Sequence, residues 1–137
     1  MTVFCLDTNI VVFALNRRRP EIAERLAAEL SAGTTLIVPA IVRFELDYGI
    51  AKSDRQEQTR AILETFFSAG FAQPAFDLLD AREAADIRAY LEDRGTPIGS
   101  FHTLIAAQAR RRAAALVTLN RREFERVRGL FVTDWAA

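Results

Sequence analysis

The sequence has very little cysteine, which removes one common source of stability. Cys5 is the only cysteine among the 137 residues, so no intramolecular disulfide bond can form. It falls in an apolar run, where cysteine usually behaves as a small buried hydrophobe. A reducing compartment is therefore the natural environment of this chain, and we expect it to be cytoplasmic.

Long hydrophobic runs are also missing. Residues 1–15 contain an apolar stretch, but Asp7 and Asn9 interrupt it, and no basic leader or small-residue cleavage site accompanies it. We therefore expect neither a secretory signal nor contact with a membrane. Flexible linkers, repeats and low-complexity tracts are absent as well. Because the 50% of hydrophobic residues are spread over the whole length, residues 1–137 are predicted to form one domain.

The chain has no excess charge of either sign. Its 18 basic and 18 acidic residues cancel, so it lacks the bulk positive field of many nucleic-acid-binding proteins. Only Lys52 is a lysine, and the arginines gather at 17–19, 110–112 and 121–128. Arginine binds phosphates and carboxylates equally well through its planar fork. Each cluster is thus compatible with RNA, with an acidic partner segment or with a solvated helix face.

Hydrophobic patterns predict strands that alternate with helices. Strands are expected at 3–6, 36–38, 71–76, 115–118 and 130–132, the third at an edge or a strand end because Pro74 interrupts it. Helices are expected to begin near residues 10, 20, 40, 55, 79, 100 and 122. Asp7 and Asp54 are predicted to cap two of them, and Pro20 and Pro39 to introduce two more. This alternation favours an α/β fold with a parallel sheet covered on both faces.

Candidate functional groups follow the predicted strand ends. Open parallel sheets bind ligands beyond the carboxyl ends of their strands, and Asp7 and Asn120 lie there. Glu45 and His102 lie near the starts of helices that follow the same edge of the sheet. Residues far apart in the sequence are therefore predicted to converge on one cleft.

Each of these residues also has an ordinary structural explanation. Asp7 is a favourable helix cap, and Glu45 is in reach of an ion pair with Arg43 or with a neighbouring helix. Glu123 stands among arginines whose mutual repulsion it would relieve. His102, the only histidine, would on its own be interpreted as a surface or structural residue.

The order of several short segments resembles the PIN-domain toxins of the VapC type. The segments are Leu6-Asp7-Thr8-Asn9, Phe44-Glu45-Leu46-Asp47-Tyr48-Gly49, Pro97-Ile98-Gly99 with Leu104-Ile105-Ala106-Ala107, Leu116-Val117-Thr118 with Asn120-Arg121-Arg122-Glu123-Phe124, and finally Gly129-Leu130 with Asp134-Trp135. Each segment is weak evidence alone, but together they span nearly the whole chain. The resemblance implies a single PIN domain, an α/β/α sandwich with a mostly parallel central sheet.

The resemblance also implies an activity and its partners. Proteins of this type are endoribonuclease toxins that depend on Mg²⁺ or Mn²⁺ and commonly cut a structured RNA such as tRNA. A cognate VapB antitoxin holds them inactive, and operator DNA is reached only through that antitoxin. A homodimer is expected on the same ground.

Carried over by position, the resemblance assigns the metal site. Asp7 would be the first metal ligand, Glu45 the second acidic residue, and Glu123 the group that completes the pocket, with Thr8, Asn9 and Asn120 in support. The third acidic position, usually Asp, is occupied by His102. A neutral imidazole offers one acceptor nitrogen and no negative charge, so it is a poorer Mg²⁺ ligand than a carboxylate.

Two alternatives to an active toxin follow from the sequence. His102 leaves open a catalytically impaired PIN-domain protein that acts through antitoxin binding and regulation of its own operon. A nucleotide-binding α/β module is disfavoured, because neither a P-loop nor a GxGxxG motif follows a predicted strand. Metal-dependent cleavage of RNA separates the active from the impaired protein.

Overall fold

The strands form one parallel sheet in the computed structural model, which describes residues 2–136. They are β1 (Val3–Leu6), β2 (Thr35–Ile37), β3 (Ala115–Val117) and β4 (Val132–Thr133). Their order across the sheet is β2-β1-β3-β4, and each neighbouring pair is parallel. The predicted α/β class is confirmed. The last strand begins two residues later than the predicted 130–132 and ends one residue later.

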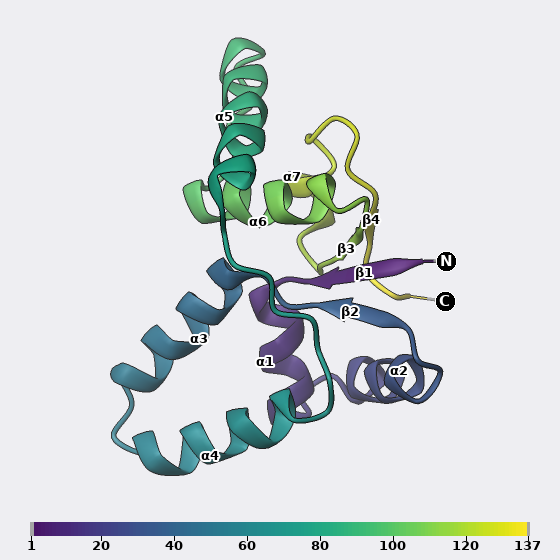
Figure 1. Cartoon of the computed structure of the whole chain (residues 1–137), viewed down its shortest axis with the longest axis vertical. Helices are drawn as coiled ribbons and strands as arrows, with labels where there is room; N and C mark the ends of the chain where they lie inside the picture. The colour runs from purple at the N-terminus through teal and green to yellow at the C-terminus, as the bar shows by residue number, and fades with distance from the viewer. Residues whose placement is uncertain (1, 137) are drawn as a thin grey trace.

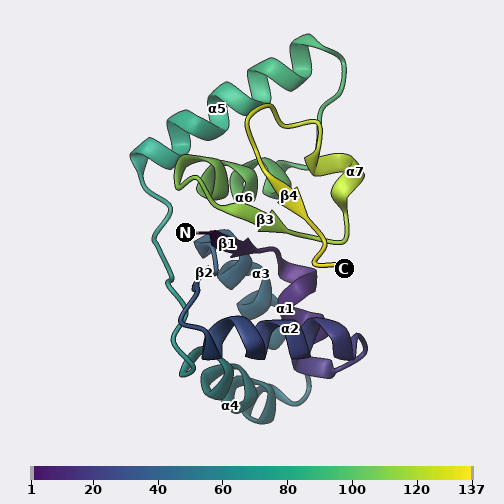
Figure 2. The same ribbon diagram turned by 90° about the vertical axis from the view of Figure 1, so that its right-hand side faces the viewer.

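Helices connect the strands and cover the sheet on both sides. They are α1 (Thr8–Asn16), α2 (Pro20–Ser31), α3 (Ala40–Ala51), α4 (Gln56–Phe67), α5 (Leu78–Asp93), α6 (Ser100–Arg111) and α7 (Arg121–Phe124). In Figures 1 and 2, α5 to α7 lie above the strands and α1 to α4 lie below them. This is the expected α/β/α sandwich. Within residues 2–136, no helix is both long and apolar enough to cross a membrane.

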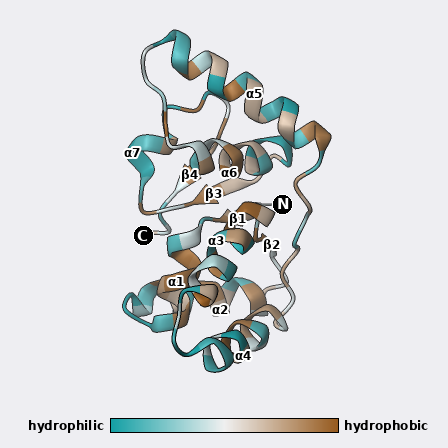
Figure 3. Cartoon of the chain, turned by 90° about the vertical axis from the view of Figure 1, so that its left-hand side faces the viewer, coloured by the Kyte–Doolittle hydropathy of each residue, from teal (hydrophilic) through white to brown (hydrophobic). Residues whose placement is uncertain are grey.

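The strands lie at the centre of the hydrophobic core. Leu6, Leu36, Leu116 and Val117 are each at most 1% exposed. Because helices cover both faces, these strands are continuous hydrophobic runs and do not alternate polar with apolar residues. Figure 3 shows apolar residues along the strands and polar residues on much of α4 and α5. The buried strands fix the position of the residues that follow them.

Two of the predicted helix starts are confirmed in detail and one is wrong. Asp7 caps α1 by accepting a hydrogen bond from the Ile10 N–H at 3.0 Å, and Pro20 is the first residue of α2. Asp54, however, does not cap α4, whose N-cap is Arg55. The Ser53 hydroxyl accepts a hydrogen bond from the Arg55 N–H at 3.0 Å, so Ser53 stabilises the turn that precedes this helix.

The strand predicted at 71–76 is reduced to a single bridge. The Ala72 N–H donates to the Leu36 carbonyl and the Val38 N–H donates to the Ala72 carbonyl, both at 2.9 Å. Pro74 has no N–H to continue the ladder. The Gln108 side chain instead donates to the carbonyl groups of Pro74 and Ala75. The segment therefore runs along the outer side of β2 without becoming a strand.

The arginine cluster at 110–112 joins α6 to α5 through ion pairs, and we call this network the α5–α6 clamp. Its pairs are Arg110 with Glu83 and Asp86, Arg111 with Asp77 and Asp80, and Arg112 with Asp80. The Asp80 side chain is fully buried. Burial alone would raise its pKa, but hydrogen bonds from Arg112, from the Asp77 N–H and from Arg111 lower it to about 2. The acidic partner of this cluster therefore belongs to the same chain.

Candidate functional site

Asp7 lies at the carboxyl end of β1, where the central strand passes into α1. The helix cap occupies one carboxylate oxygen, and only 6% of the residue is exposed. Burial raises the pKa of Asp7 above its ordinary value, while hydrogen bonding from Thr118 and Ile10 and the charge of His102 oppose this. The negative charge of Glu45 adds to the rise. The cap explanation for Asp7 is correct, yet it leaves a buried carboxylate close to other ionisable groups.

Glu45 reaches the same place from α3. Its Oε1 atom accepts a 2.7 Å hydrogen bond from the Thr8 hydroxyl, in the first turn of α1. The simple alternative of an ion pair with Arg43 is not realised, because Arg43 contacts Asp47 and Gln73 instead. Glu45 and Thr8 are therefore in direct contact, whereas Asn9 is exposed on the first turn.

Glu123 is held by three donors. Its Oε1 atom accepts from the Gly99 N–H at 2.8 Å and lies 3.0 Å from His102 Nδ1, and its Oε2 atom accepts from the Asn120 amide at 2.6 Å. Burial would raise the pKa of Glu123, but these hydrogen bonds, that of His102 first, lower it to about 2. Glu123 is thus an ionised carboxylate that holds other groups in place.

His102 is oriented by this carboxylate. An ionised carboxylate accepts hydrogen bonds and cannot donate them, so Nδ1 carries the proton in this contact and Nε2 is left for other partners. The ring packs against Phe124 with centroids 5.0 Å apart, and 39% of the side chain is exposed. His102 therefore uses one ring nitrogen to contact Glu123, and the other takes no part in that contact.

Two contributing residues were not among the sequence-based candidates. Gly99 donates its N–H to Glu123, and a Cβ atom there would lie only 3.3 Å from His102 Nδ1. Thr118 directly follows β3, faces Asp7 and accepts a hydrogen bond from the Asn120 N–H at 3.0 Å. A signal existed for each: a glycine just before a predicted helix, and a hydroxyl just after a predicted strand.

The carboxylates fit a water-rich metal site better than a crowded one. Among residues 2–136, no three His, Cys, Asp or Glu side chains are gathered in a metal-holding arrangement. Both Glu123 oxygens already have donors, whereas Glu45 Oε2 has no hydrogen-bond partner within the described residues. Mg²⁺ is commonly held by one or two carboxylates and keeps several waters. Asp7 and Glu45 meet that requirement.

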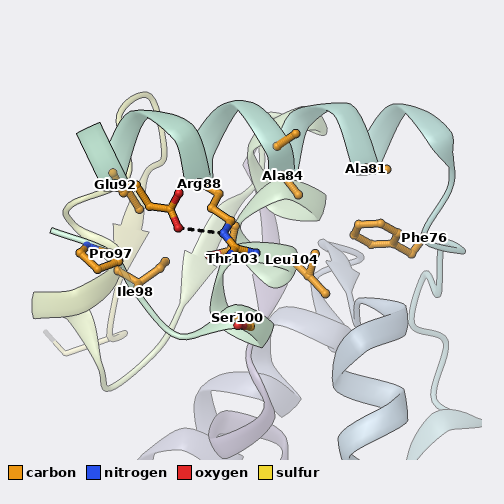
Figure 4. Close-up of a pocket in the computed structure, with 12 residues that line it drawn as sticks. Phe76, Ala81, Ala84, Arg88, Glu92, Pro97, Ile98, Ser100, Thr103 and Leu104 are labelled. Carbon is orange, nitrogen blue, oxygen red and sulfur yellow. Dashed lines mark hydrogen bonds and ion pairs between the residues drawn. The ribbon is translucent and has the colours of Figure 1, made fainter. Parts of the chain in front are cut away.

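Two hollows in the surface differ in that one is lined by candidate site residues and the other is not. A cavity of about 540 Å³ lies between α5 and α6, with mostly apolar walls and an Arg88–Glu92 ion pair at its rim (Figure 4). A groove of about 400 Å³ begins at Thr8 and Glu45 and runs between α1, α3 and α4. Its other walls are mainly apolar, including Leu15, Leu46 and Leu63. The second hollow is the one that opens onto the candidate site.

Comparison with known proteins agrees with this arrangement. The PIN domain family model matches residues 4–130. The chain is 38% identical to the tRNA(fMet)-specific endonuclease VapC of Shigella flexneri, over 99% of this chain and 100% of that protein. It is 33% identical to ribonuclease VapC2 of Rickettsia felis, over 97% and 98%.

Solved structures give the same answer. The DNA-bound VapBC complex of Salmonella typhimurium contains a chain that matches with a TM-score of 0.89 and 35% identity, covering 99% of this chain and 100% of that one. A chain of the promoter-bound VapBC2 complex of Rickettsia felis matches with a TM-score of 0.88 and 32% identity, covering 96% and 98%. The resemblance identified in the sequence is confirmed, and the chain belongs to the VapC ribonucleases of the PIN-domain family.

Proposed function

We propose that this chain is the toxin of a type II toxin–antitoxin pair and that it cuts tRNA with the help of a divalent metal ion. The observation that carries the proposal is the meeting of Asp7, Glu45 and the His102–Glu123 pair at one edge of a parallel sheet. Nucleases of this family generally depend on divalent metal ions. The cytoplasm, where tRNA is found, is the corresponding compartment.

Asp7 and Glu45 are the residues that would hold Mg²⁺ or Mn²⁺. Such an ion lowers the pKa of water and stabilises the negative charge that develops on the phosphate. The buried position of Asp7 and the hydrogen bond from Thr8 to Glu45 fix both carboxylates before any ligand arrives. The two carboxylates also supply the negative counter-charge that retains the metal, and without the metal they would repel the RNA backbone.

Glu123, Asn120 and His102 have a positioning role in this scheme. The Asn120 amide and the Gly99 N–H hold Glu123, and Glu123 in turn orients the His102 ring and leaves Nε2 for other partners. His102 and Glu123 complete the proposed site beside the two metal-holding carboxylates. Thr8 positions Glu45, and Asn9 is exposed near the entrance to interact with substrate or water.

The substrate and partner proposals draw on the relatives. Two of them, 38% and 36% identical, are named tRNA(fMet)-specific endonucleases, so initiator tRNA is the first substrate to test. The apolar groove that begins at Thr8 and Glu45 suits an apolar segment of a VapB-type antitoxin. An antitoxin arginine that reaches Asp7 and Glu45 would replace the charge of the metal. In this proposal the antitoxin contacts the operator DNA. The toxin itself forms a homodimer.

The test is cleavage of total tRNA by the purified chain, with Mg²⁺, with Mn²⁺ and with EDTA. We expect discrete products that appear with metal and disappear with EDTA. A tRNA pool that stays intact under all metal conditions, with a protein that is folded and binds its antitoxin, would contradict the ribonuclease function.

One observation favours a second candidate function. Because Glu123 and His102 already bind each other, only two carboxylates are left for the metal. A protein without nuclease activity would still engage the antitoxin and regulate its operon. Operator binding by the antitoxin that increases when this chain is added, with no tRNA cleavage, would support that role.

A further inference from the structure

Three exposed aromatic side chains form a continuous row beside the candidate site. Phe44 and Tyr48 on α3 and Phe101 on α6 are 51%, 56% and 47% exposed. The Phe44 ring lies in the middle, with its centroid 5.4 Å from that of Phe101 and 6.4 Å from that of Tyr48. We call these three residues the aromatic row. Large aromatic rings that contact one another and are open to solvent are typical of a ligand-binding or interaction surface.

The row follows the line of candidate catalytic residues. Phe44 directly precedes Glu45, and Phe101 directly precedes His102. Successive helix positions are turned by about 100°, so these rings flank the site and do not fill it. The apolar groove is lined by Glu45 and Leu46 but by none of the three rings. The aromatic row is therefore a second surface at the site, separate from the groove assigned to the antitoxin.

Charge decides what kind of ligand this surface fits. The chain has no net charge and its cleft is acidic, so bulk attraction for phosphates cannot supply the affinity for RNA. Aromatic side chains bind unpaired bases by stacking, whatever the sequence. The Lys52 ammonium lies 5.4 Å from the Tyr48 ring centroid, which places a cation for a backbone phosphate at one end of the row.

We propose that Phe44, Tyr48 and Phe101 are a stacking platform for unpaired bases of the RNA next to the bond that is cut. The proposal rests on the proposed ribonuclease function. It explains how a chain with no net charge and an acidic site holds a polyanion: the rings grip the bases while Asp7 and Glu45 face the backbone. It also assigns preference for a loop over a duplex, because paired bases have no free face.

The test is binding of a fluorescein-labelled oligouridylate, in which every base is unpaired, measured by fluorescence anisotropy in EDTA to prevent cleavage. Phe101→Leu and Tyr48→Leu keep an apolar side chain but remove the ring. We expect each to raise Kd about tenfold, which corresponds to about 1.4 kcal/mol, because the stacking contact between base and ring is lost. Phe101→Trp should retain or improve binding. Phe131→Leu is the matched control, because Phe131 is 73% exposed elsewhere and should leave Kd unchanged.

A second set of measurements ties the rings to the bases. An oligouridylate with one base removed should bind wild type more weakly, and the loss should shrink in Phe101→Leu when the missing base is the one that stacks there. Thermal melts of every variant exclude unfolding as the cause. The platform would be overturned if the oligouridylate bound the Leu variants as tightly as the wild-type protein. It would also be overturned if the wild-type protein bound no RNA.

The outcomes also separate this proposal from its premise and from its main rival. Ring-dependent binding without cleavage under any metal condition would overturn the ribonuclease function alone. Cleavage by wild type with unchanged Kd in the Leu variants would overturn the platform alone. The main rival is that the aromatic row is an interface between two copies of this chain. Light scattering tests it: variants that are monomers where wild type is a dimer, and that also bind RNA more weakly, would support the interface and overturn the platform.

Discussion

Two buried aspartates at helix N-termini, Asp7 and Asp80, have opposite electrostatic surroundings. Asp7 caps α1 and lies near Glu45, and its pKa is raised chiefly by burial. Asp80 belongs to the capping box of α5 and is paired with Arg111 and Arg112, which hold its pKa at about 2. The same residue type in similar local structure therefore costs stability in one place and provides it in the other. Asp7 has no arginine or lysine ion pair within the described residues, which supports the metal-holding role that we propose for it.

The largest expected effect is on the activity at Asp7. Asp7→Asn keeps a good helix cap but removes the charge, so we expect tRNA cleavage to fall about 100-fold or more, as for other losses at metal sites. The melting temperature without metal should stay level or rise, because the unpaired buried charge is gone. Glu45→Gln should behave in the same way. Wild-type cleavage and metal affinity in either variant would show that the residue is not a metal ligand.

Asp80 should respond in the opposite way. Asp80→Asn leaves two arginines of the α5–α6 clamp without their buried counter-charge, and we expect a loss of about 2–3 kcal/mol in the free energy of unfolding. Chemical denaturation followed by circular dichroism measures this loss. Asp86→Asn is the control, because the Asp86 side chain is 59% exposed and its pair should contribute about 0–1 kcal/mol. Equal stability of the two variants would contradict the special status of Asp80.

The stability contributed by Asp80 should be lost at acidic pH, whereas that of Asp7 should not. Because folding lowers the pKa of Asp80 to about 2 from 3.8, its contribution is fully present above about pH 4 and is lost as the pH falls toward 2. The difference amounts to about 2 kcal/mol. Wild type should therefore lose more stability than Asp80→Asn between pH 5 and pH 2 in urea titrations. Asp7 works in the other direction, since a raised pKa favours the folded state at low pH. Parallel pH curves for wild type and Asp80→Asn would refute the assignment.

The smallest of these effects concerns His102. His102→Asp adds a third carboxylate beside Asp7 and Glu45, and we expect Mg²⁺-supported tRNA cleavage and growth arrest to increase about tenfold. His102→Asn is the matched control: it removes the ring without adding charge and should give no gain. If the Asp and Asn variants and wild type all cleave equally with Mg²⁺, His102 is not a weakness of the site.

Sequence reasoning predicted the fold and named most residues of the candidate site because those signals are local. Asp7, Pro20 and the apolar strands act on their immediate neighbours, so their effects can be predicted from sequence order. Long-range contacts were not available in the same way. The partners of Arg110–Arg112 lie on α5, and the sequence does not show which acidic residues of that helix face them. Gly99 marked only a helix start in the sequence, and its contact with Glu123, 24 residues away, became visible only in the fold.

The sheet order β2-β1-β3-β4 has a consequence for synthesis of the protein. The ribosome makes Asp7 and Glu45 in the first third of the chain, but β3 must pair beside β1 before Thr118, Asn120 and Glu123 reach them. The two halves of the proposed site are therefore assembled only near the end of translation. A growing chain that has exposed only its first half would lack the complete proposed site, and we expect it to be inactive as a nuclease.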